Sequence, residues 1–175
     1  WSSDVCSSDL DKQTGEPLAP AIVWQDRRTA SWCRELKEAG HEPTVQARTG
    51  LLLDPYFSGS KIGWAMANWP QLKAAGDRLA IGTIDSWLVW KLTATGNGGG
   101  LHITDATNAS RTALMAIGSG HWDDGLIELF AAPRQALPEI VDCAGDYGST
   151  TLFGAPIPIC GMAGDQQAAT IGQAC

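Results

Sequence analysis

The residues best placed to do chemistry lie in a glycine-rich turn near the carboxyl end of the sequence. An apolar run at residues 157–160 predicts a short strand, residues 161–165 read Gly-Met-Ala-Gly-Asp, and a helix is expected from Gln166. In α/β sheets, ligands bind at the carboxyl ends of strands, where the N-terminus of a following helix favours anions. Asp165 could take the proton of a substrate hydroxyl as that oxygen attacks phosphorus. Asp is also a preferred capping residue, and the local pattern by itself favours that simpler role.

Aromatic residues at the ends of segments are the second candidate feature. Trp24 closes an apolar run at residues 21–24, and Tyr56 lies in a loop between Pro55 and Phe57. An aromatic face can pack against the C–H side of a polyol, while a phenol reaches its hydroxyl groups. Five other tryptophans fall within the expected helices and are assigned to ordinary packing: Trp32, Trp64, Trp69, Trp87 and Trp90.

The remaining polar candidates indicate structure more than chemistry. Arg27 and Arg28 could bind a phosphate, but at a helix start they are expected to be solvated or paired with Asp26. Residues 108–111 (NASR) form a polar run that favours loop stabilisation over binding. The three histidines are isolated, so the sequence predicts neither a Ser-His-Asp set nor a metal site.

Strands and helices alternate along the chain, which is typical of an α/β architecture. Extended segments are expected at residues 21–24, 79–82, 101–105, 112–117 and 157–160. Helices are expected at residues 27–39, 60–69, 86–92, 123–131 and from 166 onward, with Asp26 and Asp123 as caps. Residues 93–100 (TATGNGGG) predict a flexible loop.

The amino-acid composition argues against several classes of function. With 12 basic and 19 acidic residues, the net charge is 12 − 19 = −7, which argues against binding to nucleic acid or an anionic membrane surface. No apolar run is long enough to span a membrane. The five cysteines are odd in number and lack a C-x-x-C pair, which favours a reducing compartment, and Cys33 and Cys160 are expected to be core fillers. Residues 1–10 (WSSDVCSSDL) are expected to be non-native and without a role in the fold.

Five runs of sequence together resemble the FGGY carbohydrate kinase family. They follow the family's order and spacing across residues 11–175, and they read AIVWQDRRT (21–29), DPYFSGSK (54–61), GTIDSWLVWKL (82–92), TDATNASRT (104–112) and GMAGDQQAA (161–169). The runs DPYFSG and NASRT favour glycerol as the substrate over the pentuloses and gluconate of other family members.

The resemblance implies a fold, an activity and a set of site residues. The implied fold is the α/β, ribonuclease H-like domain of actin-type ATPases, with a mixed sheet and flanking helices, of which residues 11–175 form the later part of the N-terminal domain. The implied activity is phosphorylation of glycerol to glycerol 3-phosphate with ATP and Mg²⁺, by a cytoplasmic enzyme that is a homo-oligomer when full length. Asp165 matches the family's general base, Gln166 and Tyr56 match residues that hydrogen-bond glycerol, and Trp24 matches the aromatic against which its carbons pack.

Parts of the family pattern are absent from this sequence. The Gly-Thr-Thr phosphate loop, an Arg-Glu pair that grips glycerol, the first strands and the whole C-terminal domain have no counterpart here. No ATP-binding residue is therefore assigned, and the isolated fragment is expected to be inactive. Two alternatives stay open: another polyol or sugar kinase of the same family, or a non-catalytic polyol-binding module.

Overall fold

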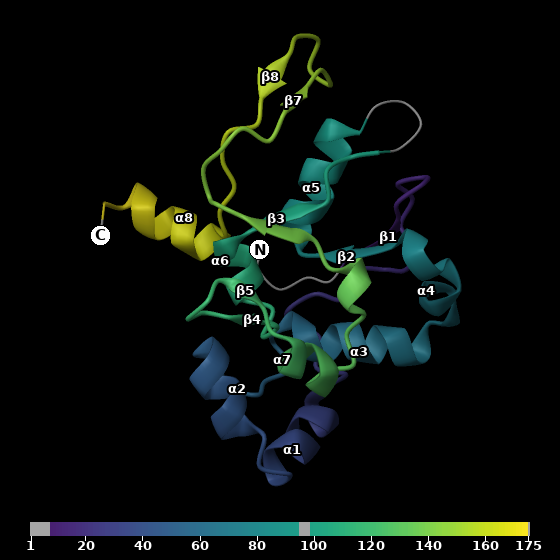
Figure 1. Cartoon of the computed structure of the whole chain (residues 1–175), viewed down its shortest axis with the longest axis vertical. Coiled ribbons are helices and arrows are strands. Elements are labelled where there is room, and N and C mark those ends of the chain that lie inside the picture. The colour runs from purple at the N-terminus through teal and green to yellow at the C-terminus, as the bar shows by residue number, and fades with distance from the viewer. Residues whose placement is uncertain (1–7, 95–98, 175) are drawn as a thin grey trace.

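The computed structural model describes residues 8–94 and 99–174 as an alternation of helices and short strands (Figure 1). The helices are α1 (Ala30–Glu38), α2 (Glu42–Thr49), α3 (Ser58–Asn68), α4 (Pro70–Ala75), α5 (Ile84–Thr93), α6 (Ala106–Ser110), α7 (Asp124–Leu129) and α8 (Asp165–Gly172), with 3-10 turns at Gly76–Arg78 and Arg134–Ala136. The strands are β1 (Ser8–Asp11), β2 (Leu79–Gly82), β3 (Ile103–Asp105), β4 (Met115–Ala116), β5 (His121–Trp122), β6 (Glu139–Val141), β7 (Ser149–Thr150) and β8 (Ile157–Pro158). The prediction of an α/β architecture is confirmed.

Antiparallel and parallel pairing both occur at the centre of the molecule. Strand β1 runs antiparallel to β2, with Ser8 opposite Gly82, whereas β3 runs parallel to β6, with Thr104 opposite Ile140. Side chains join the two pairs, because the ring of His102 lies 3.1 Å from the carbonyl oxygen of Ile81. Helix α5 lies on one side of β2 and β3, and α3 lies on the other (Figure 1). This arrangement is the mixed strand pairing with flanking helices that the resemblance implies.

One apolar cluster holds most of the elements together. Its largest members are almost fully buried: Ile22, Val45, Leu53, Ile62, Leu72, Ile81, Leu114, Leu126 and Phe130. Helix α3 passes so close to its neighbours that a Cβ at Gly63 would lie 2.1 Å from the carbonyl oxygen of Phe130 and 2.7 Å from the ring of Trp32. A larger residue at position 63 would therefore force α1 or α7 away from α3.

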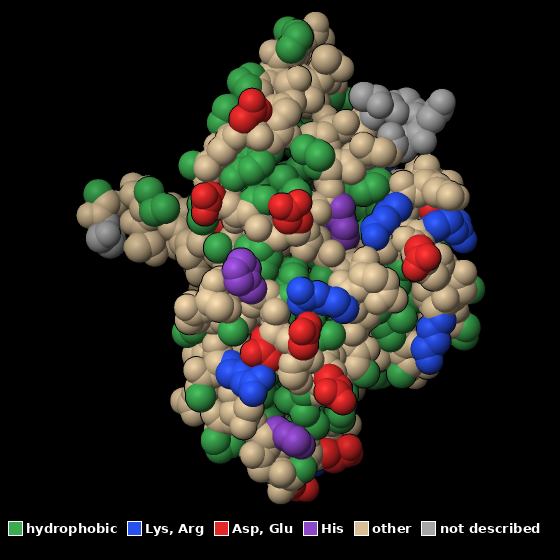
Figure 2. Space-filling model, viewed as in Figure 1, with side chains coloured by type: hydrophobic (Ala, Val, Ile, Leu, Met, Phe, Trp, Pro, Cys, Tyr) green, Lys and Arg blue, Asp and Glu red, His purple; other side chains and the backbone are tan. Residues whose placement is uncertain are grey.

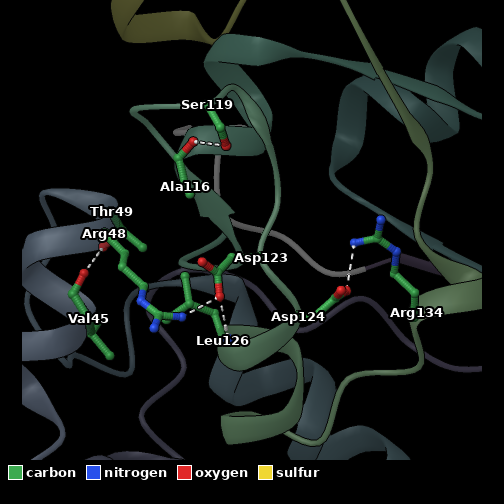
Figure 3. A network of polar contacts seen from close by, with 9 residues as sticks. All are labelled: Val45, Arg48, Thr49, Ala116, Ser119, Asp123, Asp124, Leu126 and Arg134. Atoms are coloured by element: carbon green, nitrogen blue, oxygen red, sulfur yellow. Dashed lines mark hydrogen bonds and ion pairs between the residues drawn. The ribbon is translucent and has the colours of Figure 1, made fainter.

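A polar network at the start of α7 explains why that short helix forms where it does. The Asp123 carboxylate accepts the backbone N–H of Leu126 at 3.0 Å, the bond that defines an N-cap. The same oxygen accepts from the Arg48 guanidinium of α2 at 2.7 Å, so α2 and α7 share one carboxylate (Figure 3). The predicted Asp123 cap is confirmed.

Several sequence expectations about the elements were wrong. No helix was expected between residues 40 and 59, but Glu42–Thr49 form α2, and α4 begins at Pro70, directly after the helix expected at 60–69. Residues 21–24 are not assigned as a strand, and α1 begins at Ala30 rather than after Asp26, which instead accepts the Arg28 backbone N–H. Cys33 is buried as predicted, but Cys160 is exposed.

The amino-terminal segment takes part in the fold from residue 8 onward. Although residues 1–10 were expected to have no role in it, Ser8, Asp9 and Leu10 belong to β1. Leu10 is buried beside Trp90 in a small second core cluster, whereas the buried Asp9 carboxylate has no hydrogen-bond partner in the described part of the chain. Residues 1–7 and residues 95–98 of the loop expected at 93–100 lie outside the described residues.

The last part of the chain is the least embedded. The β7–β8 hairpin and α8 project from the body (Figures 1 and 2), and their large apolar side chains are mostly exposed, including Leu152, Phe153 and Ile171. Helix α8 contains no buried residue. Among the described residues, no helix is long and apolar enough to cross a membrane.

Candidate functional site

The loop that carries Tyr56 is held by a buried lysine. Lys61, on the first turn of α3, is fully buried, and its ammonium donates to the carbonyl oxygens of Pro55 and Tyr56, the latter at 2.6 Å. An ammonium taken out of water is tolerated only where acceptors replace its hydration. The Asp54 carboxylate accepts the Tyr56 backbone N–H at 2.8 Å, which fixes the turn from the other side. The backbone of Tyr56 is therefore tied at both its N–H and its C=O.

Trp24 lies against this loop. Its ring centroid is 5.6 Å from that of Tyr56, at an interplanar angle of 57°. The segment that follows Trp24 is anchored on α3, because the Arg28 guanidinium lies 4.4 Å from the ring centroid of Trp64 while it forms an ion pair with Asp26 at 2.6 Å. The expected pairing of Arg28 with Asp26 is confirmed, and the two predicted aromatic site residues are in contact.

An open cavity of about 600 Å³ lies beside the Tyr56 loop. That volume lies within the range of small-molecule sites. Its wall combines a phenol, an amide, a carboxylate and a guanidinium with apolar surface, and the lining residues are Gly50, Leu51, Leu52, Asp54, Tyr56, Phe57, Arg111 and Gln166. Tyr56 and Gln166, 110 positions apart in the sequence, are thus brought to one cavity.

Asp165 is the first residue of α8 and lies next to Gln166. The helix begins from Gly164, whose carbonyl oxygen accepts the N–H of Ala168 at 2.8 Å. Asp165 Oδ1 accepts the N–H of its neighbour Gln166 at 2.8 Å, so the carboxylate folds over the first turn instead of occupying the N-cap position. Gly164 therefore occupies the N-cap position, for which the sequence pattern favoured Asp165. The Asp165 carboxylate is half-buried at the start of the helix.

A buried acidic network lies beneath the turn that leads to Asp165. Burial acts to raise the pKa of Asp105, but hydrogen bonds from Thr107, Asn108 and the Cys143 thiol outweigh it, so the pKa of this carboxyl lies below its usual value. For Asp85 the balance is opposite, because burial raises its pKa despite hydrogen bonds from Thr83 and Thr104. Of these two carboxyl groups, Asp105 therefore holds its negative charge more readily.

Sequence reasoning missed two residues of this cavity that carry charge. Arg111 lies on its wall, with the guanidinium 5.1 Å from the ring centroid of Phe57, although the NASR run was expected to stabilise a loop. Asn108 of the same run lies in α6 and not in a loop, and its amide donates to Asp105 at 2.7 Å. Asp54 was not predicted as a site residue. The signals available were that Asp54 lies two positions before Tyr56 and that Arg111 ends the polar NASR run.

The comparisons with known proteins decide the family. A family model described as the FGGY family of carbohydrate kinases, N-terminal domain, matches residues 6–172. The chain belongs to the FGGY family of carbohydrate kinases. The resemblance seen in the five sequence runs is confirmed.

Several relatives in the FGGY family carry the name glycerol kinase. The chain is 60% identical to glycerol kinase of Methylobacterium nodulans and 56% identical to glycerol kinase 1 of Pseudomonas aeruginosa, in each case over 94% of this chain and 33% of the relative. The chain therefore spans about a third of the length of these relatives.

Solved structures agree with the FGGY fold. A crystal structure of Plasmodium falciparum glycerol kinase with ADP matches with a TM-score of 0.88 and 37% identity, over 97% of this chain and 34% of that one. A xylulose kinase from Rhodospirillum rubrum matches with a TM-score of 0.81 at 21% identity, over 96% of this chain and 35% of that one, which shows the fold alone. The ribonuclease H-like fold implied by the resemblance is confirmed.

Within residues 8–94 and 99–174, no three His, Cys, Asp or Glu side chains cluster so that they could hold a metal ion. We therefore assign no residue of this chain to Mg²⁺.

Proposed function

We propose that this chain forms the acceptor-binding part of an ATP-dependent glycerol kinase, which converts glycerol to glycerol 3-phosphate. The observation that carries the proposal is the cavity on which Tyr56 and Gln166 meet, with Asp165 adjacent to Gln166. The identity of 60% to a relative named glycerol kinase supports glycerol as the acceptor. ATP, accompanied by Mg²⁺, is the proposed donor, and a similar structure solved with ADP supports a nucleotide.

The proposed roles follow from what each group can exchange with a triol. The Tyr56 phenol and the Gln166 amide can both donate to and accept from hydroxyl groups, and the Trp24 ring offers a flat apolar face for the carbon chain. Asp165 takes the proton of the reacting hydroxyl, while that oxygen forms the new bond to phosphorus and ADP leaves. The residues of this chain thus bind and deprotonate the acceptor.

The domain assignment and the setting of the protein are part of the same proposal. Residues 11–175 form the later part of an FGGY N-terminal domain, and residues 1–10 are non-native. We place the complete enzyme in the cytoplasm as a homo-oligomer. The cysteines are odd in number, and among the described residues Cys33, Cys143 and Cys160 are all free. Both observations support a reducing compartment.

Glycerol binding by the chain tests the proposal directly. We expect glycerol to shift the backbone amide NMR signals of Tyr56 and Gln166 in a saturable way. Gln166→Ala should weaken binding by roughly threefold to tenfold, since it removes a hydrogen bond worth about 1 kcal/mol. Gln135→Ala removes an exposed amide away from this cavity and is the matched control. Shifts that do not saturate, or equal binding by all three proteins, would contradict the proposed acceptor site.

A further inference from the structure

The turn before Asp165 is joined to the body of the fold at Gly164. Helix α8 contains no buried residue and projects from the body (Figure 1), so its own packing does not fix the direction of its first turn. Gly164 is nevertheless buried. The contacts at Gly164 therefore help to set where Asp165 and Gln166 lie.

A side chain distant in sequence contacts Gly164. The Gly164 N–H donates to the Thr107 hydroxyl oxygen at 2.8 Å, across 57 positions of sequence. Thr107 lies on α6, which follows β3 directly and contacts β3 and β6 at the centre of the fold. The Thr107 hydroxyl thus ties the turn to the body of the molecule at Gly164.

A buried carboxylate sets the orientation of that hydroxyl. The Thr107 hydroxyl donates to Asp105 Oδ2 at 2.5 Å, which leaves its lone pairs to accept from Gly164. Asp105 is fully buried, and its other oxygen accepts from the Asn108 amide at 2.7 Å. Bonds to an ionised acceptor are short and strong, so the hydroxyl is held in one rotamer.

The Asp105 carboxylate is also linked, through Cys143, to an earlier residue of the same turn, Met162. The Cys143 thiol donates to Asp105 Oδ2 at 3.1 Å, and the Cys143 carbonyl accepts the N–H of Met162 at 2.9 Å. Asp105 is therefore linked to the turn at both Met162 and Gly164, on either side of Ala163.

We propose that Thr107, oriented by Asp105, is a positioning residue that sets the place of the Asp165 carboxylate and the Gln166 amide. This inference rests on the proposed function in so far as Asp165 is the base. A displacement of about 1 Å at a reacting group can cost about a hundredfold in rate. Neither residue lines the cavity beside Tyr56, so the effect reaches the reaction through the backbone of the turn at residues 162–164.

Amide hydrogen exchange at Gly164 tests the link without any activity assay. Thr107→Val keeps the shape of the side chain and removes the hydroxyl, so Gly164 exchange should accelerate by roughly fivefold to tenfold, and Thr107→Ser should restore slow exchange. Thr93→Val is the matched control, because the Thr93 hydroxyl likewise donates to an oxygen, that of Val89, and accepts a backbone N–H, that of Leu101. Unchanged Gly164 exchange in Thr107→Val would overturn the proposal.

Turnover tests the consequence. We would replace the matching part of Methylobacterium nodulans glycerol kinase with residues 11–172 of this chain and assay ADP formation. Thr107→Val should lower kcat by about tenfold or more with a smaller change in KM, Thr107→Ser should recover it, and Thr93→Val should leave it unchanged. A normal kcat in Thr107→Val, or an equal loss in Thr93→Val, would overturn the positioning role. A parent chimera without turnover would count against the proposed function instead, and Gly164 exchange would still decide the link.

Discussion

Asp165→Asn should lower kcat of the same chimera by about 10² to 10⁴, the usual contribution of a general base. The amide is close to the carboxylate in size but cannot take the proton of the attacking hydroxyl. It can still hydrogen-bond a polyol, so the Kd for glycerol should change by less than about tenfold. The measurement is kcat from steady-state ADP formation together with glycerol binding by titration.

Asp124→Asn is the control for this substitution. Asp124 is an exposed residue of α7 whose ion pair with Arg134, at 3.4 Å, lies on the surface, so the neutral variant should keep the parental kcat. Near-normal turnover in Asp165→Asn would contradict the base assignment. Equal losses in both variants would show a general charge effect instead of a specific proton transfer.

Asp9→Val should stabilise the chain, by about 4 kcal/mol at pH 8. Burial raises the pKa of Asp9 from 3.8 to about 7, and each pKa unit corresponds to about 1.4 kcal/mol. The folded state thus holds the Asp9 proton more tightly than the unfolded state does. The parent chain therefore loses stability as the pH rises from about 4 to 7, and a valine, which has no proton to lose, avoids that loss.

Urea unfolding at pH 5 and pH 8 measures this effect. The gain in unfolding free energy from Asp9→Val should be clearly larger at pH 8 than at pH 5, whereas Asp77→Asn, at an exposed acid, should give little change at either pH. An equal gain at both pH values would show that the pKa of Asp9 is the same in the folded and unfolded states. A confirmed gain would support the proposal that residues 1–10 are non-native, because an unpartnered carboxylate occupies a buried strand position.

The parts of the fold that could be predicted are those fixed by local sequence. Residues 79–82 form β2 with the predicted bounds, and Asp123 caps α7, because apolar runs and capping residues act over a few positions. The conformations of residues 21–24 and of Glu42–Thr49 could not be predicted from local sequence. The first are apolar but not assigned as a strand, and the second form a helix of low amphipathicity that is stabilised through tertiary contacts such as Arg48 to Asp123.

The candidate site likewise has residues that the sequence could predict and contacts that it could not. Asp165 and the aromatic residues Trp24 and Tyr56 were identified from their position at the ends of segments and from the family resemblance. The contacts of Lys61 with the Tyr56 loop and of Thr107 with Gly164 were not foreseen. A buried lysine and a hydroxyl 57 positions from its partner carry no periodic signal, because three-dimensional packing alone brings them to their partners.

The central claim is that this chain binds the acceptor of a glycerol kinase, and ADP formation by the chimera with a panel of acceptors tests it most directly. The account predicts turnover that depends on glycerol and is far lower with xylulose, gluconate or no acceptor, and no turnover by the chain alone. A folded chimera that turned over with a sugar in preference to glycerol, or that bound glycerol without forming ADP, would contradict it.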